Sequence, residues 1–281
     1  MVITNLCYYA LIVLPNWGVY VDIGILGFVF SGLVVGFIVG LTGIGGGSLM
    51  TPLLLWFGIN PATAVGTDLL YAAITKSSGV IAHQRNNNIN WRIMGLLSLG
   101  SIPASLFALW LLTKFHADSH AQESIIKQAL GYVLVLTALA IFFKKQLLAY
   151  SQKSIISTKN IPPNVYTGLT VLAGVVLGIM VSLTSIGAGA LGTVALFMLY
   201  PLLTSRRLVG TEIAHAVPLT LIAGLGHASM GNVDWHLLIY LLIGSLPGVY
   251  IGGSLSGRIP ESVLRPCMAL MLLGVGYNLV V

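Results

Sequence analysis

Charged residues are scarce in this 281-residue chain, because Asp, Glu, Lys and Arg make up only 7% of it. Soluble domains average about 25% charged residues, whereas here 57% of the residues are hydrophobic. So few charges cannot cover the surface of a water-soluble protein of this size. This scarcity excludes a cytosolic enzyme, a disordered chain and an ordinary nucleic-acid binder, despite the net charge of +6.

Cysteine is also nearly absent. Cys7 and Cys267 lie far apart with no Cys-x-x-Cys spacing, so we expect buried, inert thiols. No spacing of His, Asp and Glu predicts a zinc site, and no Ser/His/Asp set predicts a hydrolase. We therefore expect no metal, no cofactor and no enzyme activity. Residues 1–22 lack the positive region of a signal peptide and are expected to form an apolar or interfacial segment, or a short extra span.

Long apolar runs dominate the rest of the chain. Residues 23–67 and 160–205 contain no charged residue, and each run exceeds twice the roughly 20 residues that one spanning helix requires. The runs lack the alternation of polar and apolar residues that barrel strands show. The predicted fold class is therefore an all-α polytopic membrane protein.

The sequence contains two copies of one unit. Four pairs of motifs recur at a near-constant offset: Gly-Leu-Thr-Gly-Ile-Gly-Gly-Gly-Ser-Leu (40–49) with Ser-Leu-Thr-Ser-Ile-Gly-Ala-Gly-Ala-Leu (182–191), Val-Gly-Thr-Asp (65–68) with Val-Gly-Thr-Glu (209–212), Asn-Ile-Asn-Trp (88–91) with Asn-Val-Asp-Trp (232–235), and Gly-Ser-Ile-Pro (100–103) with Gly-Ser-Leu-Pro (244–247). Such extended agreement indicates an internal duplication.

Each copy contains five hydrophobic segments, which predicts about ten transmembrane segments. We expect them at residues 25–44, 47–58, 62–83, 92–113 and 125–143, and at 164–184, 189–202, 206–228, 235–256 and 263–280. The first repeat is assigned to residues 23–143, a cytoplasmic linker to 144–163 and the second repeat to 164–281. The second segment of each repeat is short and is expected to be a broken or tilted helix.

An odd number of spans per repeat places the two copies in opposite orientations. With the start of the first segment outside, the basic residues gather on the cytoplasmic side, as the positive-inside rule requires. The exceptions are Lys76 within the membrane and Lys114 and Lys127 in an outer loop. This distribution predicts two inverted five-segment repeats.

Inverted repeats are characteristic of secondary transporters, which bind substrate near the midplane where the repeats meet. Breaks in helices expose N-terminal amides that attract anions, and glycine permits close approach. Residues in and beside the glycine-rich turns are the candidate substrate-binding groups: Thr42, Gly45, Gly46, Gly47, Ser48, Thr184, Ser185, Gly187 and Gly189. They predict two converging donor clusters for a small oxyanion. Alternatively, the glycines serve only tight helix packing or a hairpin.

A nucleotide site is excluded at these turns, because neither turn follows a strand or ends in the Gly-Lys-Ser/Thr of a phosphate loop. The chain contains no ATPase domain. Transport is therefore expected to draw on a gradient.

Three ionisable residues lie inside the predicted spans, where charges are costly and usually functional. Asp68 and Glu212 occupy equivalent repeat positions and are candidates for proton coupling or gating. Alternatively, each is a helix-start carboxylate near the interface, where the macrodipole favours it. Lys76 is a candidate anion contact in the substrate site, or a lysine that snorkels to the surface.

Three histidines are further candidates for proton coupling or gating, because histidine titrates near neutrality. His83 and His227 recur in both copies near helix ends, and His215 lies one turn after Glu212. The alternative is helix capping or interfacial hydrogen bonding.

Several of these motifs together resemble a known family. The Gly-x-Gly-Gly-Gly turn (43–47) followed by Pro52, Ala-Val-Gly-Thr (64–67), and His83 before Asn-Trp (90–91) are similar to the TauE/SafE sulfite-exporter family of membrane permeases. The resemblance covers about residues 24–280, although the second copy departs from the pattern at Ala188 and Val194. It implies export or uptake of small sulfur-containing anions such as sulfite, sulfoacetate or related organosulfonates across the bacterial inner membrane.

The resulting prediction is a multi-pass secondary transporter of the bacterial cell inner (plasma) membrane. Its expected substrate is a small sulfur-containing anion such as sulfite or an organosulfonate, moved with a proton gradient. Its expected partners are the lipid bilayer and that small anionic substrate, with no nucleic acid. Alternatives are a permease for another small anion or metabolite on the same fold, or a membrane enzyme or subunit without transport.

Overall fold

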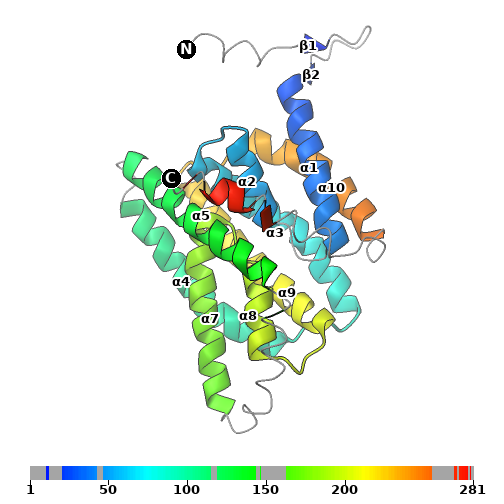
Figure 1. Ribbon diagram of the computed structural model, residues 1–281, viewed down its shortest axis with the longest axis vertical. Helices are drawn as coiled ribbons and strands as arrows, with labels where there is room; N and C mark the ends of the chain where they lie inside the picture. The colour runs from blue at the N-terminus through cyan, green and yellow to red at the C-terminus, as the bar shows by residue number, and fades with distance from the viewer. Residues whose placement is uncertain are drawn as a thin grey trace.

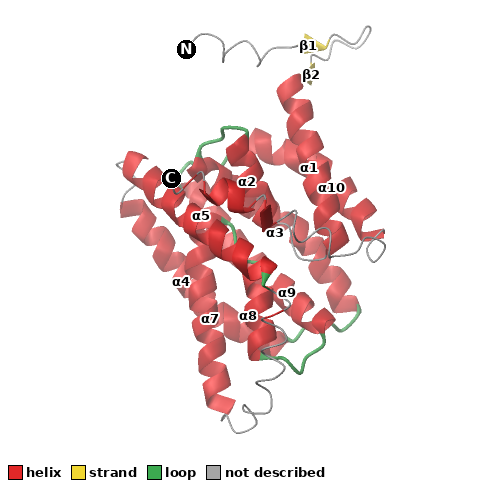
Figure 2. Cartoon of the chain, in the orientation of Figure 1, coloured by secondary structure: helices red, strands yellow, loops and turns green. Residues whose placement is uncertain are grey.

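The computed structural model describes residues 11–12, 21–42, 47–114, 119–143, 146, 163–254, 269–270, 272–277 and 279. This part of the chain is helical apart from an antiparallel pair of two-residue strands, β1 (Leu11–Ile12) and β2 (Val21–Asp22). The helices, shown in Figures 1 and 2, are α1 (Ile23–Thr42), α2 (Gly47–Trp56), α3 (Pro61–Arg85), α4 (Trp91–Lys114), α5 (Ser119–Phe142), α7 (Pro163–Thr184), α8 (Ala190–Leu199), α9 (Ser205–Ser229) and α10 (Trp235–Ser254). The predicted all-α class is confirmed.

The helix positions agree with the hydrophobic segments read from the sequence. Each predicted segment from 25–44 to 235–256 overlaps one helix. Most of the tenth segment, 263–280, and most of the linker 144–163 lie outside the described residues, as do residues 43–46 of the first glycine-rich turn.

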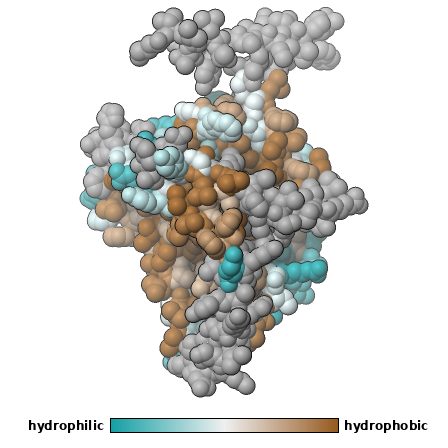
Figure 3. Space-filling view, viewed as in Figure 1, coloured by the Kyte–Doolittle hydropathy of each residue, from teal (hydrophilic) through white to brown (hydrophobic). Residues whose placement is uncertain are grey.

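Six described helices are long and apolar enough to cross a bilayer: α1, α4, α5, α7, α9 and α10. Large apolar side chains are exposed on their outer surfaces, and Figure 3 shows them across the middle of one face. Helices α2 and α8 have only 10 residues each, which is about 15 Å of helix against a hydrocarbon core of about 30 Å. The second segment of each repeat is therefore short, as the sequence predicts.

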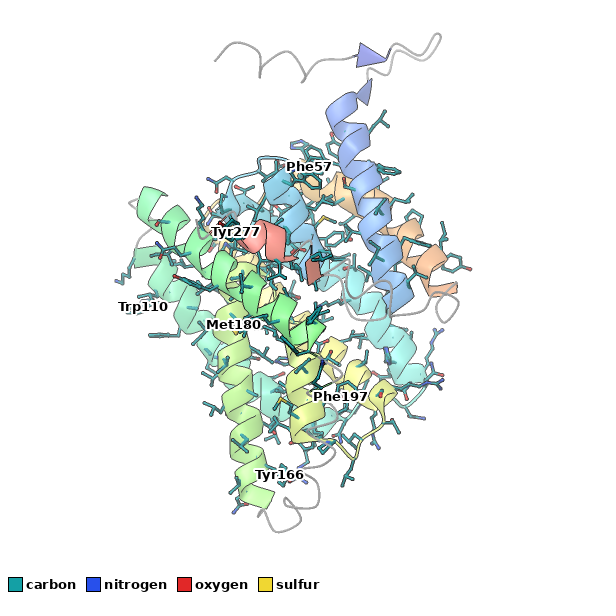
Figure 4. The ribbon with its side chains drawn as sticks, in the orientation of Figure 1. Phe57, Trp110, Tyr166, Met180, Phe197 and Tyr277 are labelled. Atoms are coloured by element: carbon teal, nitrogen blue, oxygen red, sulfur yellow. The ribbon has the colours of Figure 1, made fainter. Side chains whose placement is uncertain are left out.

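Aromatic side chains lie at both ends of the helical bundle. Phe57 lies towards the upper end in Figure 4 and packs edge-on against Phe28, with ring centroids 5.7 Å apart. Tyr166 lies at the lower end, 6.3 Å from the ring of Tyr200. Aromatic residues at two opposite ends are typical of the two interfaces of a membrane protein.

The helices of the first half pack against those of the second half in matching pairs. Helix α1 lies along α10, α4 lies along α7, and α3 packs against α9 (Figure 1). Glycines make the first two contacts possible: a Cβ at Gly36 of α1 would collide with the backbone of Ser245, and a Cβ at Gly178 of α7 would collide with the backbone of Ser101. Small residues at such crossings let membrane helices approach closely.

The Val-Gly-Thr motifs form hydrogen bonds to the opposite half of the chain. The backbone N–H of Asp234 donates to Thr67 Oγ1 over 3.1 Å, and the N–H of Asn90 donates to Thr211 Oγ1 over 2.9 Å. The preceding Gly66 and Gly210 lie against the carbonyls of the same two loops, where a side chain would clash. These two repeated motifs therefore hold the halves together.

Equivalent elements of the two halves run in opposite directions in Figure 1. Helix α1 begins at the upper end of the view, whereas α7 begins at the lower end. The loop between α2 and α3 is likewise at the upper end, and the loop between α8 and α9 at the lower end.

Candidate functional site

The three ionisable residues predicted inside the membrane lie in the packed interior of the protein. The exposed fraction is 0% for Asp68, 4% for Lys76 and 1% for Glu212. Asp68 and Lys76 are on α3 and Glu212 is on α9, and these two helices pack against one another. Lys76 interacts electrostatically with both carboxylates. The sequence separates these residues, and the fold brings them into one buried cluster.

Lys76 connects this cluster to the broken-helix turn of the second half. Its ammonium group donates to the carbonyl oxygen of Ala188, in the turn 185–189 between α7 and α8. The snorkelling alternative is therefore wrong, because the ammonium group lies inside the protein rather than at its surface. The equivalent residue in the second half is Thr220, whose hydroxyl donates to its own helix at Ala216 over 2.8 Å. Lys76 thus breaks the symmetry of the repeat.

The turn 185–189 has a backbone conformation that requires glycine. Gly187 and Gly189 have φ angles of 113° and 151°, and Ser185 is also left-handed at 58°. A side chain at either glycine would be strained. The Ser185 hydroxyl is 1% exposed and lies near the Asp68 carboxylate, but among the described atoms it has no hydrogen-bond partner of standard geometry.

Thr184 has a structural role in this turn. Its hydroxyl donates to the carbonyl of Met180 over 2.7 Å and accepts from the N–H of Ile186 over 3.1 Å. These bonds fix the end of α7 and leave the hydroxyl committed to the backbone. Of the predicted hydroxyl donors in the second turn, Thr184 is bonded to the backbone, whereas Ser185 lies beside the Asp68 carboxylate.

The first glycine-rich turn can be placed only in part. Gly45 and Gly46 lie outside the described residues. Thr42 is the last residue of α1, and Gly47 and Ser48 begin α2, but only their backbones are described. The predicted convergence of two donor clusters therefore stays a prediction.

The two equivalent carboxylates differ in their hydrogen bonding. Asp68 Oδ2 accepts from the backbone N–H of Thr51 over 3.2 Å and also from the Thr51 hydroxyl. Within the described structure, both carboxylate oxygens of Glu212 are buried without a hydrogen-bond partner. Glu212 instead lies against Gly192 of α8, where a Cβ would be 3.2 Å from Oε1. One oxygen of Asp68 is therefore bonded, whereas neither oxygen of Glu212 has a partner among the described residues.

The interpretation of these carboxylates as helix-start residues is wrong. Helix α3 begins at Pro61 and α9 at Ser205, so Asp68 and Glu212 each lie about two turns inside a helix. The macrodipole effect falls off within the first turn. Both groups are buried polar residues at a helix crossing.

The three histidines occupy different environments. His215 is 1% exposed and its Nε2 lies 2.8 Å from the Ser101 hydroxyl of α4. His227 is 0% exposed, and its Nε2 lies 2.9 Å from the Ser182 carbonyl of α7. His83 is half-buried and packs against Gly210. Only His215 lies within one turn of a buried carboxylate.

The sequence did not identify three further residues of this cluster as site residues: Thr51, Tyr71 and Ser101. Ser101 belongs to the repeated Gly-Ser-x-Pro motif, which supplied a signal, but its histidine partner comes from the other half of the chain. Tyr71 occupies the position in α3 that His215 occupies in α9. Its hydroxyl is buried next to Ser245, which is the repeat equivalent of Ser101.

A bundle of apolar helices that encloses charged residues is typical of a multi-pass membrane protein with a functional site inside it. Comparison with known proteins gives the family. A model of the sulfite exporter TauE/SafE family matches residues 28–279, and the chain belongs to that family.

Relatives of known sequence agree with this assignment. The chain is 45% identical to the probable membrane transporter protein YjnA of Bacillus subtilis, over 90% of this chain and 98% of that protein. It is 30% identical to the probable membrane transporter protein YdhB of the same organism, over 84% and 92% of the two chains. It is 28% identical to the probable membrane transporter protein MJ0441 of Methanocaldococcus jannaschii, over 86% and 91%. No solved structure matches the chain at a significant level.

Proposed function

We propose that this protein is a secondary transporter that moves a small sulfur-containing anion, such as sulfite or an organosulfonate, together with protons across the bacterial inner membrane. The observation that carries the proposal is the burial of Lys76 on α3, where the carboxylates of Glu212 and Asp68 both act on it electrostatically. A buried ammonium group is costly unless it is paired. The same ammonium group would attract and bind an anion.

Charge balance couples the anion to protons. With Lys76 protonated and both carboxylates ionised, the cluster has one net negative charge, which repels an anion. Each proton that a carboxylate takes up makes the cluster more attractive to an anion, and a bound anion in turn favours protonation. This reciprocity is what thermodynamic linkage requires of two ligands that share a site.

The neighbouring turn supplies further groups suited to an oxyanion. Ser185 offers a buried hydroxyl, and residues 187–189 bring backbone close to Lys76 and the start of α8. Backbone N–H groups at a helix start favour negative charge. These groups fit any small oxyanion, and the family description favours sulfite or a related sulfur compound among them.

The proposal includes the ten-segment, inverted five-plus-five arrangement. Two observations support it: the matched pairing of α1 with α10 and α4 with α7, and the opposite directions of α1 and α7. In this arrangement α2 and α8 are half-length segments that place the glycine-rich turns near the midplane, where transporters with inverted repeats bind substrate. The boundaries stay as proposed, with repeats at 23–143 and 164–281 joined by a cytoplasmic linker.

The test is flux in proteoliposomes that contain the purified full-length protein. Radiolabelled sulfite is expected to accumulate when a pH gradient is imposed, and sulfoacetate is the second probe. Lys76→Ala is expected to abolish flux, whereas Lys76→Arg keeps the charge and is expected to retain part of it. Lys114→Ala is the matched control, because Lys114 is exposed at the end of α4. Absence of flux for every anion tested, or equal flux in the wild type and Lys76→Ala, contradicts the proposal.

A further inference from the structure

Four buried side-chain oxygens near Asp68 have no hydrogen bond of standard geometry within the described structure. They are Asp68 Oδ1 and the hydroxyl oxygens of Tyr71, Ser185 and Ser245. Each of these residues is at most 1% exposed. Buried oxygens are nearly always satisfied by a protein group, a water molecule or an ion, because leaving one unpaired is costly. Four such atoms in one region indicate a shared ligand.

The four oxygens come from three elements and lie around one carboxylate. The Ser185 hydroxyl, in the turn after α7, lies beside the Asp68 carboxylate. The Tyr71 hydroxyl, one turn after Asp68 on α3, lies beside the Ser245 hydroxyl of α10 and interacts electrostatically with Asp68. Thr51 of α2 makes two hydrogen bonds to the other carboxylate oxygen, Oδ2. We call these five residues the Asp68 hydroxyl cluster.

We infer that the Asp68 hydroxyl cluster binds one monovalent cation, with Na⁺ as the probe. The inference goes beyond the proposed function, because it assigns a cation site that can be tested in the absence of any anion. The site is next to the anion site rather than part of it. A hydroxyl group such as that of Ser185 can offer its oxygen to a cation and still donate its proton to an anion.

The chemistry of the cluster favours a hard ion with a single positive charge. Its potential ligands are carboxylate and hydroxyl oxygens, which suit hard cations, with no nitrogen or sulfur among them. Asp68, Glu212 and Lys76 together have one net negative charge when all three are ionised, and one monovalent cation cancels it. A divalent ion would leave an excess positive charge buried beside Lys76, which already acts on Asp68. Within the described residues, no three His, Cys, Asp or Glu side chains gather as a divalent metal site would require.

The end of α7 adds a second reason for a cation. The helix ends at Thr184, and Ser185 follows in a left-handed conformation with a φ of 58°. The C-terminal end of a helix has a partial negative charge, and such ends of broken helices coordinate Na⁺ or protons in transporters with inverted repeats. The same turn already binds one positive group, because the Lys76 ammonium group donates to the Ala188 carbonyl.

The equivalent hydroxyl positions of the second half are already bonded. Ser101 is the equivalent of Ser245, and its hydroxyl lies 2.8 Å from Nε2 of His215, which replaces Tyr71. Such a serine is satisfied by a protein partner, whereas Ser245 is not. The pair in the second half therefore needs no ion.

The carboxylate of the second half also has different neighbours. Thr193, the equivalent of Thr51, donates its hydroxyl to the carbonyl of Gly189 rather than to Glu212. The electrostatic interaction of Lys76 with Glu212 is larger than that with Asp68, so the buried ammonium group mainly compensates Glu212. The cation site is accordingly assigned to the first half alone.

The test is thermal unfolding of the detergent-purified full-length protein without sulfite, starting from sodium-free buffer. NaCl is added while choline chloride keeps the ionic strength constant. A ligand that binds only the folded state raises the unfolding temperature, so the wild type is expected to show a saturable rise with Na⁺ and none with MgCl₂. Asp68→Asn removes the charge of the site and is expected to abolish the rise.

Two milder variants each remove one oxygen of the site. Tyr71→Phe and Ser245→Ala are expected to need about 3–10-fold more Na⁺ for the half-maximal rise. The matched control is Thr137→Val on α5, which also removes a buried hydroxyl without a partner among the described residues but lies outside the cluster. Its response to Na⁺ should equal that of the wild type.

Three results overturn the inference. They are the absence of a saturable rise with Na⁺ or K⁺ in the wild type, an equal rise in Asp68→Asn, and a rise with MgCl₂ that exceeds the rise with NaCl. If Asp68→Asn does not fold, Tyr71→Phe decides, because an unchanged half-maximal Na⁺ concentration overturns the site. None of these measurements involves an anion, so failure of the cation site is distinguishable from failure of sulfite transport.

Discussion

The first and second halves of this protein are nearly identical in their packing and different in their chemistry. Gly36 and Gly178 approach the opposite half at equivalent positions, and Thr67 and Thr211 make equivalent hydrogen bonds across the contact. In the charged cluster, however, Asp68 accepts hydrogen bonds from Thr51, whereas Glu212 has no hydrogen-bond partner among the described residues. The duplication preserves the glycines and threonines that join the halves. The hydrogen bonding of the two equivalent carboxylates differs. Equivalent substitutions should therefore have equal effects in the scaffold and unequal effects in the charged cluster.

The largest effect is expected where glycines allow the helices to touch. Gly36→Leu and Gly178→Leu should each lower the free energy of unfolding by about 3 kcal/mol or more, because the new side chain would meet backbone of the opposite helix. Thermal unfolding of the detergent-purified protein measures the loss.

The matched controls lie on the same two helices. No described atom lies within 4 Å of a Cβ built at Gly27 of α1 or Gly168 of α7, so leucine at these positions should be tolerated. A much smaller loss for Gly36→Leu than for Gly178→Leu would show that the two contacts are not equivalent.

A smaller and unequal effect is expected from the equivalent serines. Ser101→Ala removes the partner of His215 Nε2 inside the protein, so it should cost about 1–3 kcal/mol. Ser245→Ala removes a buried hydroxyl that lies beside that of Tyr71 but makes no standard hydrogen bond among the described residues, so it should cost less than Ser101→Ala. Denaturant or thermal unfolding of both variants tests the difference, and equal losses would contradict it.

The smallest loss of stability is expected from the two threonines that accept hydrogen bonds from loops of the opposite half. Thr67→Val and Thr211→Val keep the shape of the side chain and remove one hydrogen bond across the contact. Each should lower stability by about 1 kcal/mol, the usual net value of such a bond. The measurement is the difference between the melting temperatures of the two variants. It should be close to zero if the two hydrogen bonds are equivalent.

Much of the fold was predictable because each helix is an apolar run between short polar loops. The bounds of α3 and α9, for example, follow the predicted segments 62–83 and 206–228 to within a few residues. The repeat also drew attention to Asp68 and Glu212, since charges in apolar runs are conspicuous.

The environment of those charges was not predictable from spacing alone. Whether Lys76 reaches the surface or the interior depends on which turn of the other half lies beside it, and Ala188 is 112 residues away in sequence. The bond between Ser101 and His215 likewise joins residues of different halves. Serine in a membrane helix commonly bonds to its own backbone, so its sequence context gave no reason to pair it with a histidine.

The most direct test of the account is sulfite binding to the detergent-purified protein, measured as protection against thermal unfolding. A ligand that binds only the folded state raises the unfolding temperature as its concentration rises. We predict saturable protection of the wild type by sulfite, greater at low pH than at high pH, and none in Lys76→Ala. Equal protection of the wild type and Lys76→Ala would contradict the assignment of the buried lysine to the anion site.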